Sequence, residues 1–466
     1  MLDHLVADRI SAVPILPVSE ESLPEALARL DEVERRWVET TQYLGAPGKF
    51  ALLPDGAGRL KRVLIGVRRG EELWGLAALP DALPPLSSQG AAYALEGEYA
   101  ADAATRFALG WALGCYAFTR YRARDKAWAD LVWPANADRG RVERLARGVG
   151  LARDLINTPA EDMGPPELAE AAQSLAAKHG ARYRVIVGDA LVEQNYPAIH
   201  MVGRAAEKAP RLIDFVWGNE NAPKLTLVGK GVCFDTGGLD LKPSSGMRMM
   251  KKDMGGAATL LGLASAIMEA KLPVRLRVMV PAVENAVAGN AFRPLDIIKT
   301  RKGMTVEVGN TDAEGRLILC DALYEACGEK PALLIDMATL TGAARTALGA
   351  ELPALFSNDD TVADELLHFG LVESDPLWRL PLWKPYRQMI VSPIADLNNV
   401  SESSFAGAIT AALYLDAFVT QGTPWIHIDT YAWNQKSRPG RPEGGEALAM
   451  RALYSLIEHR FGRGSN

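Results

Sequence analysis

The feature that most constrains this chain is a glycine-rich segment at residues 229–258, which reads GKGVCFDTGGLDLKPSSGMRMMKKDMGGAA. The apolar residues 225–228 before it predict a short buried strand, and the Ala/Leu-rich residues 255–270 predict a helix. Glycines at this density suit a backbone that turns sharply and approaches a ligand closely. The segment therefore predicts a strand, a ligand-binding loop and a helix, which together form an α/β unit.

Four charged residues in this segment favour a bound cation: Lys230, Asp235, Lys242 and Asp253. Two carboxylates and two lysines that converge at the end of a strand are costly to bury without a partner. Hard divalent ions take oxygen ligands and would provide that partner. Each residue taken alone is also consistent with a solvated loop charge, because most Lys and Asp side chains are exposed.

A second acidic segment, VEVGNTDAEGRL at residues 306–317, predicts a strand, a turn and the start of a helix. Asp312 and Glu314 would lie where the loop becomes helical. In open α/β sheets, ligands bind in the crevice outside the carboxyl ends of the strands, so the two segments are expected to present their carboxylates from one side. Together with Asp235 and Asp253, these four carboxylates suit a pair of divalent metals.

The run GKG-x-x-FD-x-GG-x-x-x-KP at 229–243 and the octapeptide NTDAEGRL at 310–317 resemble the leucyl (cytosol) aminopeptidase family of two-metal exopeptidases. The octapeptide is highly specific, and the longer run agrees in order and spacing. Further similar stretches are DMATLTGA at 336–343, ALFSND at 354–359, AGAIT at 406–410 and WIHID at 425–429. The resemblance implies a metal-dependent aminopeptidase that releases N-terminal residues, leucine-like ones preferred, from short peptides with a free N-terminus.

The same resemblance implies two divalent ions per chain, Zn²⁺ and/or Mn²⁺, with Mg²⁺ and Co²⁺ as alternatives. Asp235 and Glu314 would bridge the ions, Asp253 and the Lys230 amine would complete one site, and Asp312 would complete the other. A lysine ligand must be deprotonated, which burial and a nearby cation favour. Because metal binding lowers the pKa of water, a bridging water would become a nucleophile near neutral pH.

Two further residues are expected to act on the reacting groups. Lys242 would donate to the oxyanion as the peptide carbonyl becomes tetrahedral. Arg316 matches a position that holds a bicarbonate ion in the family, and that ion would carry the proton to the leaving amine. The positions that correspond to the substrate cradle and the side-chain pocket are Thr339, Leu340, Thr341, Gly342 and Met250. Met250 also fits a core-filling role.

At 466 residues the chain exceeds what one hydrophobic core usually supports, so two α/β domains are expected. The expected divisions are a smaller N-terminal domain at 1–138, a linker helix at 139–157 and a catalytic domain at 158–466. The N-terminal part contains strand candidates at 51–53, 63–67 and 74–76 and helix candidates at 22–39 and 102–116.

Helical and strand-like segments alternate in the second part of the chain. A helix is expected at 167–179, and strands at 183–187, 198–203, 212–217 and 274–280. This order predicts a central mixed sheet flanked by helices.

Composition and charge narrow the classes of protein to consider. The chain is 48% hydrophobic and 23% charged, with a formal charge of −6, which offers no broad basic field for nucleic acid or an anionic membrane. No apolar run of 18 residues lacks charges, and residues 1–17 do not follow a signal-peptide pattern. The four cysteines form no CxxC pair, so a reducing, cytoplasmic location without membrane attachment is expected.

The resemblance also implies a homohexamer whose active sites face an inner cavity. A basic, aromatic stretch at 120–128 is consistent with a nucleic-acid patch, but the interspersed Asp125 favours a solvated edge, so nucleic acid is not an expected partner. One alternative is a DNA-binding or scaffold protein that retains the aminopeptidase fold. Another is a two-metal phosphatase or amidase.

The C-terminal region departs from the family pattern. Where the family carries a Thr-Gly-Arg-Pro-like turn, residues 444–447 read Gly-Gly-Glu-Ala, and Pro-Gly-Arg-Pro stands just upstream at 439–442. In relatives this loop helps to shape the specificity pocket. The substrate preference is therefore less transferable than the chemistry.

Overall fold

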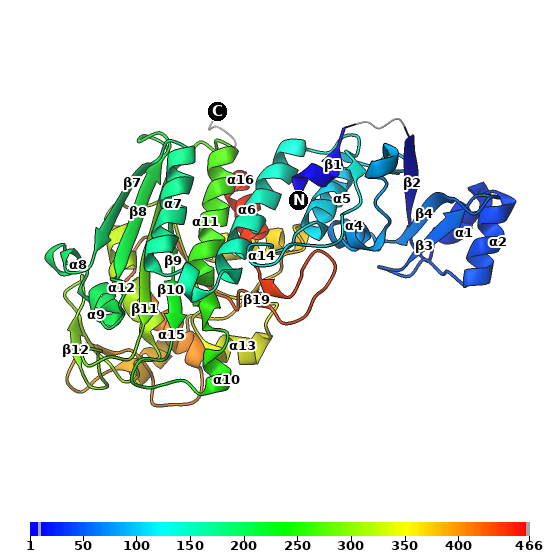
Figure 1. Cartoon of the computed structure of the whole chain (residues 1–466). Coiled ribbons are helices and arrows are strands. Elements are labelled where there is room, and N and C mark those ends of the chain that lie inside the picture. The colour runs from blue at the N-terminus through cyan, green and yellow to red at the C-terminus, as the bar shows by residue number, and fades with distance from the viewer. Residues whose placement is uncertain (8–10, 463–466) are drawn as a thin grey trace. The chain divides into compact units, whose positions relative to one another are not determined.

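The computed structural model describes residues 1–7 and 11–462, which form two compact units. One unit comprises residues 1–150 together with residues 436–443, and the other comprises the remaining residues. The boundary between the two units falls within helix α6 (Arg139–Asn157). Figure 1 labels the elements of both units.

The first unit contains a six-stranded sheet in the order β1-β6-β5-β2-β4-β3. The pairs are parallel except β3–β4, which is antiparallel. The strands are β1 (Leu5–Val6), β2 (Ser11–Val18), β3 (Phe50–Pro54), β4 (Leu60–Gly66), β5 (Ala91–Leu95) and β6 (Leu131–Val132). The helices are α1 (Leu23–Arg29), α2 (Glu32–Thr41), α3 (Glu72–Gly75), α4 (Leu79–Ala82) and α5 (Ala101–Gly114).

Two predictions for this unit were wrong in detail. Residues 74–76 are not a strand but belong to the region of α3, where the buried side chains Leu73 and Leu76 are spaced for a helix. The single helix expected at 22–39 is two helices. Asp31 begins the second one with a capping box, in which its side chain accepts from Glu34 N at 2.9 Å and Glu34 accepts from Asp31 N at 3.0 Å.

Residues 436–443 lie late in the chain but fold with the first unit. The Arg441 guanidinium lies over the Trp74 ring, 4.3 Å from its centroid. Gly440 has a φ of +67°, and a Cβ there would lie 3.0 Å from both the Ala77 side chain and the Trp74 ring. A glycine at this position therefore suits both the left-handed backbone and the close packing.

The second unit contains a nine-stranded mixed sheet in the order β16-β15-β18-β14-β9-β11-β8-β7, with β10 paired to β11. The neighbouring strands β18, β14, β9 and β11 are parallel, whereas β8, β7 and β15 introduce antiparallel pairs. The strands are β7 (Arg182–Val187), β8 (Arg211–Trp217), β9 (Lys224–Gly229), β10 (Gly231–Asp235), β11 (Arg275–Asn285), β14 (Leu333–Ala338), β15 (Ala354–Ser357), β16 (Trp378–Arg379) and β18 (Trp425–Asp429). Separate small sheets join β12 (Ile297–Lys299), β13 (Thr305–Glu307) and β17 (Leu397–Asn398), and β19 (Trp433–Asn434) with β20 (Gly444–Gly445).

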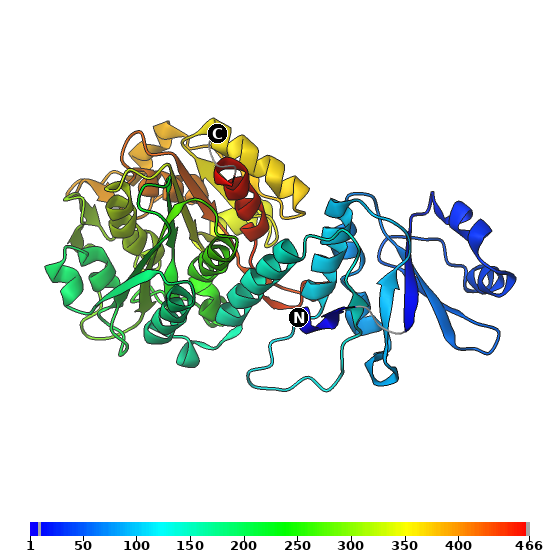
Figure 2. The ribbon, with the colours of Figure 1, turned by 90° about the horizontal axis from the view of Figure 1, so that it is seen from above.

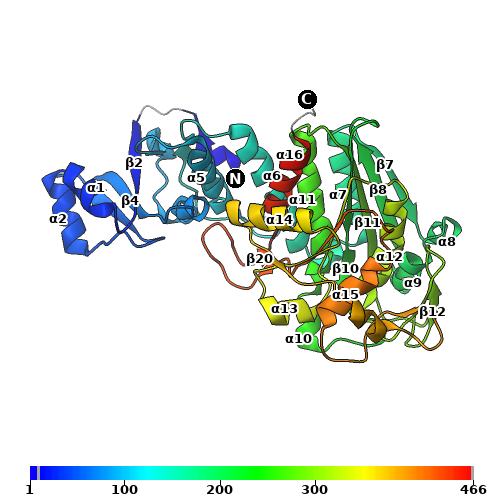
Figure 3. The ribbon, with the colours of Figure 1, turned by 180° about the vertical axis from the view of Figure 1, so that it is seen from behind.

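Helices cover both faces of this sheet (Figure 2). One face carries α7 (Pro165–Lys178), α11 (Gly255–Glu269) and α16 (Met450–Phe461), with α14 (Asp360–Val372) packed against α16. The other face carries α9 (Pro197–Gly203), α12 (Glu314–Cys327) and α15 (Gly407–Asp416), which share one hydrophobic core and are seen from behind in Figure 3. The predicted mixed sheet flanked by helices is therefore confirmed.

Two local predictions for this unit were wrong. Residues 198–203 form helix α9 rather than a strand, because Pro197 opens the helix and the distant Asp321 carboxylate accepts from Ala198 N at 2.8 Å. Residues 231–235, expected to be loop, form strand β10. In the described part of the chain, no helix combines the length and apolar composition needed to cross a bilayer.

Candidate metal centre and active site

The polar residues predicted from both sequence segments gather at one edge of the large sheet. Lys230 directly follows β9, Asp235 ends β10, Thr339 follows β14, and Glu314 opens α12. These strands run parallel, so their carboxyl ends meet at the same edge, which is where α/β sheets bind ligands.

Lys230 is the centre of the first group. Its Nζ lies 2.8 Å from Asp253 Oδ2 and 2.9 Å from Glu314 Oε1, and it donates to Thr339 O at 2.9 Å. Gly315 makes room for this amine, because a Cβ there would lie 2.7 Å from Nζ. Although burial opposes the charge, the Asp253 and Glu314 carboxylates raise the pKa of Lys230 above its ordinary value.

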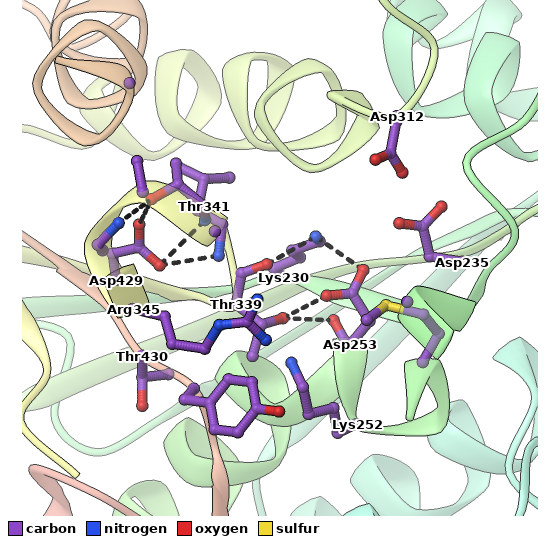
Figure 4. A pocket seen from close by; sticks show the side chains of 18 of the residues that line it. Lys230, Asp235, Lys252, Asp253, Asp312, Thr339, Thr341, Arg345, Asp429 and Thr430 are labelled. Carbon is purple, nitrogen blue, oxygen red and sulfur yellow. Dashed lines mark hydrogen bonds and ion pairs between the residues drawn. The ribbon is translucent and has the colours of Figure 1, made fainter. Parts of the chain in front are cut away.

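The second group contains Asp235, Asp312 and Lys242. Lys242 Nζ lies 2.8 Å from Asp235 Oδ2 and also forms an ion pair with Asp312. The other oxygen of Asp235 accepts from Gly237 N at 2.8 Å and from Asn285 Nδ2 at 2.9 Å, which fixes the carboxylate. Figure 4 shows Asp235 and Asp312 facing each other beside the Lys230–Asp253 pair.

The two groups meet at Glu314 and hold more negative charge than their protein partners satisfy. Asp235, Asp312 and Glu314 each offer an oxygen within 4.8 Å of the others. Within the described residues, no group donates a hydrogen bond to the buried Glu314 Oε2. Burial and then repulsion from Asp235 raise the pKa of Glu314 to about 8 and that of Asp312 to about 6. This excess of buried carboxylate oxygens fits divalent cations.

These groups open into a cavity of about 440 Å³. Arg316 lines the cavity and donates from Nη1 to Asn399 O at 2.6 Å. Its Nε is buried and has no hydrogen-bond partner among the residues that the structure describes, and burial lowers the pKa of Arg316. An unsatisfied, buried guanidinium N–H suits a small bound anion.

The predicted substrate-cradling residues line the same cavity: Met250, Thr339, Leu340, Thr341 and Gly342. Asp429, the last residue of β18, holds their loop in place. It accepts from Leu340 N at 2.9 Å and from Thr341 N at 3.2 Å through Oδ1, and from Thr341 Oγ1 at 2.6 Å through Oδ2. The residues predicted for the site are therefore brought together, and their individual roles stay predictions.

Comparison with known proteins identifies the family. A model described as the cytosol aminopeptidase family, catalytic domain, matches residues 150–454, and one described as the M17 aminopeptidase, N-terminal domain, matches residues 13–134. The chain belongs to the cytosol aminopeptidase family. It is a metal-dependent aminopeptidase and hence a hydrolase, and the resemblance seen in its motifs is confirmed.

Individual relatives agree with this result. The aminopeptidase is 41% identical to a probable cytosol aminopeptidase of Geobacter sp. (strain M21), over 76% of this chain and 75% of the relative. It is 46% identical to Peptidase B of Serratia proteamaculans (strain 568), over 72% of this chain and 79% of the relative. None of these matches supports the alternative of a DNA-binding or scaffold protein.

Solved structures extend the similarity over nearly the whole chain. The crystal structure of cytosol aminopeptidase from Coxiella burnetii is similar with a TM-score of 0.94 and 47% identity, over 98% of this chain and 100% of that one. The bottromycin maturation enzyme BotP in complex with Mn is similar with a TM-score of 0.86 and 30% identity, over 97% and 99% of the two chains.

Sequence reasoning missed several residues that line the aminopeptidase cavity: Lys252, Arg345, Asp429, Thr430 and Tyr431. Asp429 ends the WIHID stretch, so its place at a strand end was a usable signal. Lys252 adjoins Asp253 but has no motif of its own. Its side chain is buried, which lowers its pKa to about 8.

The stretch that departs from the family pattern is structural in this aminopeptidase. Gly444 and Gly445 form β20, and Glu446 is buried directly after it. Glu446 accepts from Arg153 Nη2 at 2.9 Å and from Asn434 Nδ2 at 2.6 Å. Although burial opposes ionisation, Arg153 and these hydrogen bonds hold the pKa of Glu446 below its usual value.

Proposed function

We propose that this aminopeptidase removes single residues from the free N-terminus of short peptides by means of two divalent metal ions per chain. The observation that carries the proposal is the group of carboxylates around the buried Glu314, whose Oε2 receives no hydrogen bond from the described residues. Zn²⁺ and/or Mn²⁺ suit this mixture of carboxylate and amine ligands, with Mg²⁺ or Co²⁺ as alternatives. The manganese complex of BotP supports metal binding in this fold.

We propose that Asp253 and Lys230 would hold one ion and Asp312 the other, and that Asp235 and Glu314 would contribute ligands to both. When bound, the ions supply charge that polarises the peptide carbonyl and activates a water molecule. Lys230 must give up its proton to become a ligand, so the contacts that now hold its ammonium mark the place of a cation. Asn285 and Gly237 keep the Asp235 carboxylate in position by hydrogen bonding to its other oxygen.

Lys242 and Arg316 provide the remaining chemistry. Lys242 lines the cavity, and its ammonium can donate to the oxygen that becomes negative in the transition state. In the metal-free protein, burial opposes the charge of Lys242, but the Asp235 and Asp312 carboxylates raise its pKa above the ordinary value. Arg316, which lines the cavity and has an unsatisfied Nε, would hold a bicarbonate ion, and a bound bicarbonate would supply a proton carrier for the leaving amine.

The substrate peptide would lie along Thr339, Leu340, Thr341 and Gly342, with its first side chain toward Met250. Asp429 stabilises this cradle through three hydrogen bonds to Leu340 and Thr341. A preference for leucine-like first residues remains the prediction that the family resemblance supports. The free amine would be held at the metal centre, which explains why the chain end is required.

We further propose a homohexamer that acts in the cytoplasm, with residues 158–466 as the catalytic domain, 139–157 as a linker helix and 1–138 as an N-terminal domain. Enclosure of the active sites within the hexamer would restrict access to short peptides. Light scattering at working concentrations tests the assembly, because a fully active monomer would contradict it.

The proposed activity is tested with Leu-Gly, N-acetyl-Leu-Gly and an aryl phosphate ester, each with metal-loaded protein. Leu-Gly should be cleaved, whereas the acetylated peptide should be a poor substrate because its amine is blocked. Release of phosphate without release of leucine would favour the two-metal phosphatase alternative and overturn the proposal. Rapid internal cleavage of blocked peptides would overturn the exopeptidase assignment.

A further inference from the structure

Lys252 is a buried cation on the wall of the active-site cavity that the proposed mechanism does not use. It lies on the short helix η4 (Met250–Met254) and is 4% exposed. In the described chain, Lys252 forms no ion pair, in contrast to Lys230 and Lys242, each of which contacts two carboxylates. A charged amine is rarely buried without a partner, because desolvation is costly.

A second cation, Arg345, lines the same side of the cavity. Lys252 Nζ and the Arg345 guanidinium lie 4.4 and 5.1 Å from the centroid of one aromatic ring, Tyr431. Figure 4 shows the Lys252 amine directed toward the Arg345 guanidinium. Arg345 likewise forms no ion pair within the described residues, so neither cation has a carboxylate at ion-pair distance.

The nearest acidic residues are committed elsewhere. Both oxygens of Asp429 accept from the Leu340–Thr341 cradle. Asp253 accepts from Thr339 Oγ1 at 2.7 Å and contacts Lys230 at 2.8 Å. The cavity thus has a cationic corner, defined by Lys252, Arg345 and Tyr431, in which no protein carboxylate forms a direct ion pair with Lys252 or Arg345.

We infer that this cationic corner binds the side-chain carboxylate of a peptide whose first residue is Glu or Asp. The inference rests on the proposed aminopeptidase function. Lys252 stands on η4 between Met250, placed at the side-chain pocket, and Asp253, placed among the proposed metal ligands. A first side chain of sufficient length therefore brings its carboxylate to Lys252, where Tyr431 and Arg345 complete an amphipathic wall.

The inference is tested with the glutamyl, glutaminyl and leucyl p-nitroanilides, using metal-loaded enzyme. Glutamate and glutamine have the same length and differ in charge, so the ratio of their kcat/KM values isolates recognition of the carboxylate. The wild-type ratio should exceed one. Lys252→Met should lower the glutamyl-to-glutaminyl ratio by roughly 10- to 100-fold, as expected for loss of a hydrogen bond to a charged group. Activity on the leucyl anilide should be retained. The loss should fall mainly on KM, because the contact exists in both the ground and transition states.

Two matched variants sharpen the test. Lys251→Met makes the same substitution one residue away, where the amine donates to Asn157 O and lies outside the cavity lining, so it should leave the ratio unchanged. Lys252→Arg keeps a positive charge and should retain part of the preference. Arg345→Met should have a smaller effect than Lys252→Met, because Arg345 is exposed.

Three results would overturn the inference while leaving aminopeptidase activity intact. The first is a wild-type glutamyl-to-glutaminyl ratio of kcat/KM of one or less. The second is an equal loss of kcat/KM for all three anilides in Lys252→Met. The third is a loss of activity of Lys252→Met on Leu-Gly that is larger than its loss on Leu-glycinamide. The last result would place the peptide's α-carboxylate at Lys252 instead. Failure of the wild-type enzyme to cleave any of the anilides would instead refute the proposed function. If Lys252→Met does not fold, the wild-type ratio and Lys252→Arg still decide.

Discussion

Lys230 and Lys242 are only twelve positions apart, yet the geometry gives them different tasks that substitution can separate. Lys230 lies 2.8 Å from Asp253 and 2.9 Å from Glu314, within the proposed ligand set. Lys242 lies 2.8 Å from Asp235 and also faces the cavity where the substrate carbonyl would lie. We therefore expect Lys230→Ala to impair metal binding and Lys242→Ala to impair turnover.

The loss of stability expected for Lys230→Ala follows from the buried ion pair between Lys230 and Asp253, whose side chains are each 4% exposed. Removing one partner of such a pair leaves an uncompensated charge and typically costs about 3–5 kcal/mol, which should appear in the unfolding free energy of the metal-free protein. One metal site should also weaken, because its amine ligand is lost, and excess metal should partly restore activity.

Lys242→Ala should retain both ions but lose about 10²–10³-fold in kcat, the usual loss for one preorganised oxyanion donor. Its KM should change little, because that contact forms mainly in the transition state. Arginine at position 242 should not restore full activity, since a planar guanidinium differs from an ammonium. Metal content by mass spectrometry and steady-state kinetics check both variants. If Lys242→Ala loses metal while Lys230→Ala keeps two ions, the assignment of the two lysines is reversed.

The remaining predictions concern metal dependence, a buried ion pair and the substrate cradle. Exhaustive chelation should abolish peptide hydrolysis and addition of Zn²⁺, Mn²⁺ or Co²⁺ should restore it, whereas full turnover by metal-free protein would contradict the metal mechanism. Glu446→Gln should lower the unfolding free energy by about 3–5 kcal/mol, since it removes the negative charge that lies 2.9 Å from the buried Arg153. Because folding depresses the pKa of Glu446, its stabilising contribution should be present above the unfolded pKa and disappear as the pH falls through the folded pKa. Denaturant titrations of the metal-free protein should therefore show a smaller acid-dependent loss of unfolding free energy in Glu446→Gln than in the wild type. Thr341→Val removes a 2.6 Å hydrogen bond to Asp429 and should mainly raise KM, which initial-rate measurements would show.

Much of the site was predictable from the sequence because its ligands are concentrated in two short segments. Asp235 and Glu314 each stand at the boundary of a strand or helix, where a strand-then-polar pattern is easily recognised. Spacing alone could not show that the Lys230 amine lies between Asp253 and Glu314, since that contact depends on the packing of α12 against β9.

Residues whose position depends on distant parts of the chain were not predictable in this way. Helix α9 was mistaken for a strand because its first backbone N–H, that of Ala198, is capped by the Asp321 carboxylate, 123 positions later. Lys252 and Tyr431 carry no motif, and their proximity arises only when η4 and the end of β18 meet at the cavity. Local patterns thus indicate strand ends and ligands, whereas long-range packing determines the shape of the substrate pocket.

The membership of residues 436–443 in the first unit has a consequence for synthesis of the protein. A ribosome completes residues 1–150 long before it adds Arg441, so the Trp74 ring lacks its late partner while almost 300 intervening residues are made. The nascent first unit therefore lacks the contact of Arg441 with the Trp74 ring until translation is nearly finished. Ribosome-bound chains that end before residue 436 should be cleaved near Trp74 by protease faster than chains that extend past the segment.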